Sequence, residues 1–292
     1  MRRSADPIQF EVRRQLAGAG NLTLRGEQDG PLDGEASALV LLHGVSATRR
    51  DVLQGSRHLA RRGYRLVAYD ARGHGASDPA PQPDDYGYPE LVDDLRAVLD
   101  QLKIDRPVLV GSSMGAATAL AFALDEPTRV RALVQITPAY TGRRTTKLDF
   151  EIWDRMADEL ERGGVEQFVR AATPDELPER WRELARRATR QRMGRHQHLE
   201  AVSAAMRVVP RSRAFNGLEE LEGLQVPMLI VGSRDEADNV HPLEVAHEYA
   251  KRLPRAELLV EDEGESPLAW QGARLSSAIG DFLERVGIRP HE

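Results

Sequence analysis

The sequence predicts an α/β fold: a mostly parallel, doubly wound sheet of about eight strands with an inserted helical cap. Short, continuously apolar runs alternate with helical stretches along most of the chain. This alternation is typical of a parallel sheet that helices cover on both faces. Between residues 141 and 213 the alternation stops, and the segment has helical patterns, many arginines and no strand-like run. We therefore expect residues 1–140 and 214–292 to form the core domain and residues 141–213 to form the cap.

Six apolar runs predict the parallel strands, at residues 38–42, 65–70, 107–111, 131–136, 226–232 and 256–260. Helical patterns predict the helices of the core domain, at residues 49–62, 90–104, 114–124, 243–253 and 267–286. The N-terminal segments 7–14 and 21–30 are expected to add antiparallel strands at one edge of the sheet.

The composition is that of an ordinary globular protein, with 41% hydrophobic and 29% charged residues in a chain of 292. No apolar run is long enough to span a membrane, and the basic N-terminal start lacks the apolar segment of a secretory signal. We therefore expect a cytoplasmic protein that acts on a small molecule and has no membrane partner. The net charge of −6 argues against a nucleic-acid partner. A monomer and a homodimer are both compatible with the sequence.

The absence of cysteine excludes disulfides, thiolate catalysis and cysteine-based metal sites. The eight histidines include no His-x-x-x-His pair. We therefore expect neither a metal site nor a cofactor.

Charge is distributed unevenly along the chain, because residues 141–213 contain 16 basic against 12 acidic residues. A positive cap on an acidic body would favour anionic substrates by electrostatic steering. The simpler interpretation is a set of solvated helix faces with ion pairs between successive turns.

The sequence Gly111-Ser112-Ser113-Met114-Gly115 follows a predicted strand and precedes an alanine-rich predicted helix. This is a Gly-x-Ser-x-Gly pattern in the strand–turn–helix context that gives it chemical meaning. The tight turn would hold Ser113 in a strained conformation with its hydroxyl free, and the N–H of Met114 would point to where an oxyanion forms. Ser113 is therefore the candidate nucleophile. The alternative is a glycine-rich turn without chemistry.

With this motif the chain resembles the α/β-hydrolase superfamily, in particular its esterase-like and lipase-like members with a helical cap. The resemblance extends from about residue 8 to residue 286. His43-Gly44, after a predicted strand, is similar to the family's HG loop, and the resemblance implies that the N–H of Val45 is the second oxyanion donor. The sequence DARGHGASD at residues 70–78 is similar to the family's Asp-x-Arg-Gly-x-Gly-x-Ser turn.

The catalytic acid and base are placed by the same resemblance. The loop VGSRDEADNVHP implies Asp235 as the acid, with Asp238 as the near alternative. The family's catalytic histidine usually follows a glycine after the last strand, but here Gly264 is followed by Glu265. A carboxylate of pKa about 4.3 is a weaker proton acceptor than an imidazole of pKa about 6.5, although burial beside Asp235 would raise the pKa of Glu265.

Three histidines are alternative candidates for the base: His241 in the acid loop, and His196 and His198 in the cap. The resemblance implies a serine hydrolase that acts on carboxylic ester, thioester or lactone bonds through an acyl-enzyme on Ser113, with an atypical or impaired base. The alternative is a catalytically impaired homologue that binds a small-molecule ligand.

Overall fold

The computed structural model describes residues 6–16, 20–32, 36–142, 147–173, 175, 177, 179–234, 240–265 and 270–290, with backbone only at 147–149 and 180. Within them the chain forms a sheet of eight strands in the order β1-β2-β4-β3-β5-β6-β7-β8. The strands are β1 (Ile8–Leu16), β2 (Gly20–Asp29), β3 (Ala38–Leu42), β4 (Arg65–Tyr69), β5 (Val108–Ser112), β6 (Ala132–Ile136), β7 (Met228–Gly232) and β8 (Ala256–Val260).

Strand directions confirm the predicted sheet. The β1–β2 and β2–β4 pairs are antiparallel, and all pairs from β4 through β8 are parallel. The two N-terminal segments therefore form the expected antiparallel edge. Because β3 to β8 run in one direction, the loops that follow these strands meet at one end of the sheet.

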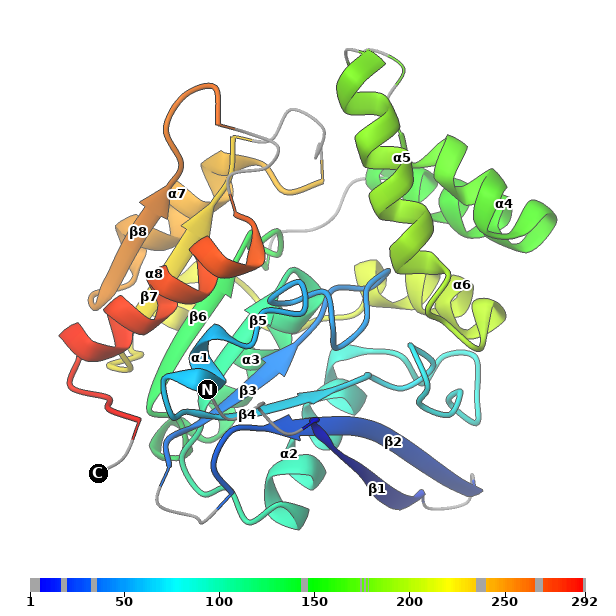
Figure 1. Ribbon diagram of the computed structural model, residues 1–292. Helices are drawn as coiled ribbons and strands as arrows, with labels where there is room; N and C mark the ends of the chain where they lie inside the picture. The colour runs from blue at the N-terminus through cyan, green and yellow to red at the C-terminus, as the bar shows by residue number, and fades with distance from the viewer. Residues whose placement is uncertain are drawn as a thin grey trace.

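Helices cover both faces of this sheet (Figure 1). The helices that pack on the sheet are α1 (His58–Arg61), α2 (Tyr88–Gln101), α3 (Met114–Asp125), α7 (Leu243–Arg252) and α8 (Gly272–Arg285). Short 3₁₀ turns lie at Pro127–Arg129, Val209–Arg211 and Leu218–Leu221. Side chains of α1 and α8 share one buried cluster with the sheet, whereas α2, α3 and α7 share another. The sheet is therefore apolar on both faces, which explains why its strands are continuous apolar runs and do not alternate with polar residues.

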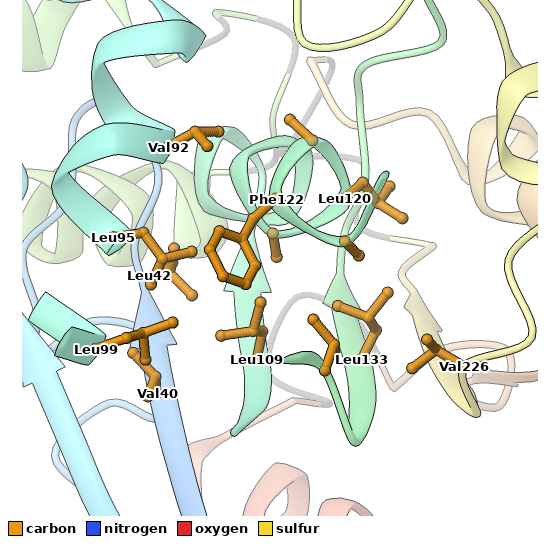
Figure 2. Close-up of a cluster of buried hydrophobic side chains, with 14 of the residues drawn as sticks. Val40, Leu42, Val92, Leu95, Leu99, Leu109, Leu120, Phe122, Leu133 and Val226 are labelled. Atoms are coloured by element: carbon orange, nitrogen blue, oxygen red, sulfur yellow. The ribbon is translucent and has the colours of Figure 1, made fainter. Parts of the chain in front are cut away.

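The core between the sheet and helices α2 and α3 is densely filled (Figure 2). Helices α2 and α3 contribute the fully buried side chains of Leu95, Leu99 and Phe122 to this core. Strands β5 and β6 contribute Leu109 and Leu133. This packing fixes α3, and with it the turn that joins β5 to α3.

Three further helices lie between β6 and β7 in the chain: α4 (Lys147–Ala171), α5 (Glu179–Met193) and α6 (Leu199–Val208). They gather beyond the end of the sheet to which the parallel strands point (Figure 1). Helix α4 bends at Gly163 and Gly164, where the backbone is not helical and Gly164 has φ 61°. These helices are the helical part of the segment predicted as a cap, and their buried side chains pack in one cluster with residues of the core domain such as Val45 and Met114.

Two predicted helices differ from the structure. Residues 49–62 form turns followed by the short α1, because Gln54 and Gly55 have φ of 48° and 72°, which a right-handed helix does not allow. Helix α8 begins at Gly272 and not at residue 267; residues 266–269 lie outside the described part. None of the helices that the structure describes is long and apolar enough to cross a membrane.

Candidate active site

Ser113 occupies the turn between β5 and α3 in a strained backbone conformation. Its φ of 52° and ψ of −111° confirm the strain expected from the sequence, because a residue with a side chain rarely adopts a positive φ. Side chains at the flanking glycines would prevent this turn: a Cβ at Gly111 would overlap the backbone of Gly115, and a Cβ at Gly115 would overlap the carbonyl of Leu42. The elbow is therefore fixed by close backbone contacts.

The loop after β3 lies directly beside this elbow. A Cβ placed at Gly44 would be 3.4 Å from the Cβ of Ser113 and 4.0 Å from its Oγ. Within the described residues, the backbone N–H groups of Val45 and Met114 donate to no acceptor, and the Ser113 hydroxyl makes no hydrogen bond. An unpaired N–H is normal at Met114, the first residue of α3, and Val45 directly follows Gly44, which lies beside the elbow. Both N–H groups are therefore unpaired close to the loop and the elbow that meet at Ser113.

His43 supports the loop through both of its ring nitrogens. Its Nδ1 lies 2.8 Å from the carbonyl oxygen of Gly44, and its Nε2 accepts the N–H of Ala71 at 2.9 Å. Because one nitrogen accepts, the ring is neutral with its proton on Nδ1. Burial lowers the pKa of His43 to about 3, and the neighbouring His74 adds to the effect. His43 is therefore a structural residue of the loop.

Two more histidines extend this support from the loop into the cap. The ring of His74 lies 5.1 Å from that of His43 and 5.6 Å from that of His196, centroid to centroid. His74 contacts the carbonyl oxygen of Val45, and His196 accepts the N–H of Gly75 at 2.9 Å through Nδ1. Burial lowers the pKa of His74, and it lowers the pKa of His196 to about 3. His74 is almost completely buried.

A buried ion pair holds the turn at residues 70–78. Arg72 and Asp94 are 2% and 1% exposed, and they form two parallel hydrogen bonds of 2.7 and 2.8 Å. Arg14 of β1 also pairs with Asp94. Burial opposes the charge of Arg72, but hydrogen bonding and attraction by Asp94 raise its pKa above the ordinary value. The pair joins the turn, helix α2 and the edge of the sheet.

A cavity of about 890 Å³ opens beside Ser113. Its described wall comprises residues 43–47, the elbow residues Ser112 and Ser113, parts of α4 and α5, and Val240 and His241 after β7. This volume is within the range of small-molecule sites. The cavity therefore lies between the loops at this end of the sheet and helices α4 and α5, with Ser113 on its wall.

Charges on this wall are of both signs. Three arginines of α4 and α5 (Arg155, Arg170 and Arg192) and three carboxylates (Asp51, Glu159 and Asp175) contribute to it. Many other arginines of the cap are paired along or between helices, as in Arg190–Glu166 and Arg207–Glu161. For these arginines, the simpler interpretation of the sequence, in which the helix faces are solvated and ion-paired, therefore holds.

The structure does not bring Glu265 into this cavity. Its carboxylate forms a salt bridge of 2.8 Å with Arg274 and accepts the N–H of Asp262 at 3.1 Å, and its side chain is 37% exposed. Glu265 is not part of the cavity wall. The pKa of Glu265 is lowered, chiefly because Arg274 donates to it, so the expected rise in its pKa is wrong. Asp235 and Asp238 lie outside the described residues.

Glu261, at the end of β8, is a buried carboxylate that the sequence analysis did not identify. It accepts the hydroxyl of Ser233 at 2.9 Å and the N–H of Arg234 at 2.6 Å, and it lies 3.2 Å from Nε1 of Trp270. The same indole N–H lies 2.9 Å from the carbonyl oxygen of Gly232. Glu261 therefore joins the end of β8 to the start of the loop after β7. In the sequence, the only indication of this buried carboxylate was a charged residue directly after an apolar strand.

Metal ligands are not clustered in the described part of the chain, where no group of three or more His, Asp or Glu side chains could hold an ion.

Comparison with known proteins supports the same fold. A family model described as alpha/beta hydrolase fold matches residues 37–273. The chain is 32% identical to 2-hydroxymuconate semialdehyde hydrolase of Pseudomonas sp. (strain CF600) over 75% of this chain and 76% of the relative. It is 38% identical to Epoxide hydrolase 2 of Siraitia grosvenorii, but that match covers only 38% of this chain and 35% of the relative. A thermophilic esterase structure from Thermogutta terrifontis superposes with a TM-score of 0.75 at 24% identity, covering 97% of this chain and 99% of that one.

Proposed function

Because the chain belongs to the alpha/beta hydrolase fold family, we propose that it is a serine hydrolase that cleaves carboxylic ester, thioester or lactone bonds through an acyl-enzyme on Ser113. The observation that supports this most is the geometry around one hydroxyl. Ser113 is held at a strained turn on the wall of a cavity of about 890 Å³, and the free N–H groups of Val45 and Met114 flank it.

The reaction follows from this arrangement. The Ser113 oxygen attacks the carbonyl carbon, and the negative charge that develops on the carbonyl oxygen is stabilised by the N–H groups of Val45 and Met114. Removing one such donor typically costs roughly 10²–10³-fold in rate, so two preorganised amides are a large part of the catalysis. Asp235 is proposed as the acid that orients the base.

The bond class rests on the residue at the elbow, because the relatives are named for different substrates. Opening an epoxide through an ester intermediate requires a carboxylate nucleophile. The chain carries Ser113 at this position, and the similarity to the plant epoxide hydrolase covers about a third of each chain. Acyl transfer is therefore favoured over epoxide opening.

A fluorophosphonate probe and p-nitrophenyl acetate test this proposal. We expect the probe to label Ser113, and Ser113→Ala to remove the label and to lower turnover by roughly 10³-fold or more. Ser112→Ala is the matched control, because it removes the neighbouring hydroxyl from the same wall and should keep the label. A wild-type protein that is not labelled at Ser113, and whose turnover equals that of Ser113→Ala, would reject the proposal.

The second candidate function is ligand binding by a homologue that has lost its base. It is favoured by Glu265, which replaces the family's histidine and is paired with Arg274 outside the cavity wall. This function predicts small esters that raise the melting temperature and are recovered unchanged. Steady conversion of such a stabilising ester, dependent on Ser113, would exclude it.

A further inference from the structure

The loop after β3 forms a tight turn beside Ser113. The carbonyl oxygen of Gly44 accepts the N–H of Ala47 at 3.0 Å, so Val45 and Ser46 are the two central residues of this turn. The N–H of Val45 is one of the two proposed oxyanion donors. Because this N–H lies in the same rigid peptide plane as the carbonyl of Gly44, its direction depends on how the turn is held.

Three consecutive carbonyl oxygens of this turn face three histidine rings. The carbonyl oxygens of residues 44, 45 and 46 lie 2.8, 2.5 and 3.5 Å from ring nitrogens of His43, His74 and His196, in that order. The first two histidines belong to the core domain, whereas His196 lies between α5 and α6 in the cap. The cap therefore reaches the turn that carries the proposed oxyanion donor.

Two hydrogen bonds to Gly75 hold the ring of His196 in place. Its Nδ1 accepts the N–H of Gly75 at 2.9 Å, and the N–H of Gln197 donates to the carbonyl oxygen of Gly75, also at 2.9 Å. Because Nδ1 accepts, the neutral ring has its proton on Nε2, the nitrogen that faces Ser46. The side chain is 9% exposed. Both the position and the tautomer of His196 are therefore defined.

Arg195, the preceding residue of the cap, holds the far end of the turn. Its guanidinium pairs with one carboxylate oxygen of Asp51, and the other oxygen accepts the N–H and the hydroxyl of Thr48, both at 2.8 Å. Thr48 directly follows Ala47, the last residue of the turn. Arg195 therefore acts on the end of the turn, and His196 faces its third carbonyl.

We propose that Arg195 and His196 are positioning residues of the oxyanion hole, which hold the turn at residues 44–47 so that the N–H of Val45 faces the carbonyl oxygen of the substrate. This role rests on the proposed serine-hydrolase function. The described wall of the cavity includes neither Arg195 nor His196. Their effect on the reaction therefore passes through the loop and not through contact with the substrate.

This role differs measurably from that of a cap which only encloses the substrate. An oxyanion donor acts on charge that develops in the transition state, so its displacement lowers kcat and leaves KM nearly unchanged. Helices α4 and α5 contribute to the cavity wall, so a cap that is merely loosened would weaken substrate binding and raise KM. The ratio of the two effects separates positioning from enclosure.

Turnover of p-nitrophenyl acetate by variants of the full-length protein tests the proposal. We expect His196→Ala and Arg195→Met each to lower kcat by roughly 10–100-fold and to keep KM within about threefold of wild type. Melting temperatures verify that the variants are folded. His196→Asn should recover much of the lost kcat, because its side-chain oxygen can accept the N–H of Gly75.

Inhibition by an alkyl trifluoromethyl ketone reports on the oxyanion hole directly. The oxygen of Ser113 bonds to the carbonyl carbon of this ketone with loss of the serine proton, and the former carbonyl oxygen becomes an oxyanion. We expect the inhibition constant to rise in His196→Ala and Arg195→Met by about the factor by which kcat/KM falls. The inhibition constant of the corresponding alcohol, which cannot form this adduct, should stay unchanged.

Arg190→Met is the matched control, because it removes a cap arginine that forms an exposed pair with Glu166. It should keep kcat within about threefold of wild type. If turnover depends on Ser113 but both His196→Ala and Arg195→Met keep the kcat of wild type, or change KM alone, the positioning role is wrong and the hydrolase function stands. Absence of Ser113-dependent turnover in the wild type overturns both.

Discussion

Replacing Asp94 with asparagine is expected to lower the free energy of unfolding by about 3–5 kcal/mol. Arg72 and Asp94 are both almost completely buried, and the carboxylate also pairs with Arg14. The substitution removes the negative charge and leaves the buried guanidinium without a counter-ion, which costs more than the pair itself contributes. Urea unfolding followed by circular dichroism measures the loss.

Asp93→Asn is the matched control for this prediction. Asp93 is the adjacent residue of α2, but its side chain is 57% exposed and it pairs with Arg96 one turn along the helix. Exposed pairs of this kind contribute about 0.3–0.5 kcal/mol. Equal losses in Asp93→Asn and Asp94→Asn would show that burial of the Arg72 pair has no special role.

Local sequence patterns predicted most of the strands, because strands buried on both faces are continuous apolar runs. The runs at 38–42 and 256–260 coincide with β3 and β8. The prediction of a helix at 49–62 was wrong because turns, and not a helix, bury most of the apolar residues of this segment. Gln54 and Gly55 adopt positive φ values, which the spacing of apolar residues does not reveal.

The elbow was visible in the sequence because its serine and both of its glycines lie within five residues, although the contact that requires Gly115 is made with the carbonyl of Leu42 on β3. The glycines two residues away on each side permit the close backbone contacts of the turn in which Ser113 has a positive φ. The position of His196 is different: it results from packing of the cap on Gly75, which is 121 residues away. The place of His241 on the cavity wall likewise depends on tertiary structure, because β6 separates β7, which precedes His241, from β5, which leads to Ser113.

Lowering the pH from 7 to 5 is expected to destabilise the protein by about 2–4 kcal/mol through the histidine stack of His43, His74 and His196. Burial lowers the pKa of His43 and of His196 to about 3, and it also lowers the pKa of His74. The unfolded chain binds protons near an ordinary pKa of 6.5, whereas the folded chain does not bind them until far lower pH. The contribution of these histidines to the free energy of unfolding is therefore fully present above about pH 6.5, and it decreases as the pH falls toward 3.

Charged groups near the stack do not reverse this sign. Attraction by Asp51 acts on His43 and attraction by Asp70 acts on His196, but desolvation and the neighbouring histidines outweigh both. Carboxylates whose pKa is lowered in the fold, such as Asp78 and Glu126, are protonated mainly below pH 4.5, outside this window. Urea midpoints at pH 7, 6 and 5 isolate the histidine contribution.

His196→Asn separates the stack from the rest of the protein. An asparagine oxygen can take the place of Nδ1 and accept the N–H of Gly75, but it does not titrate. We expect this variant to lose about 2 kcal/mol less than wild type between pH 7 and pH 5, whatever its stability at pH 7. His247→Asn, which changes an exposed histidine, should lose as much as wild type. The same pH dependence in His196→Asn and wild type would show that His196 is not held neutral by the fold.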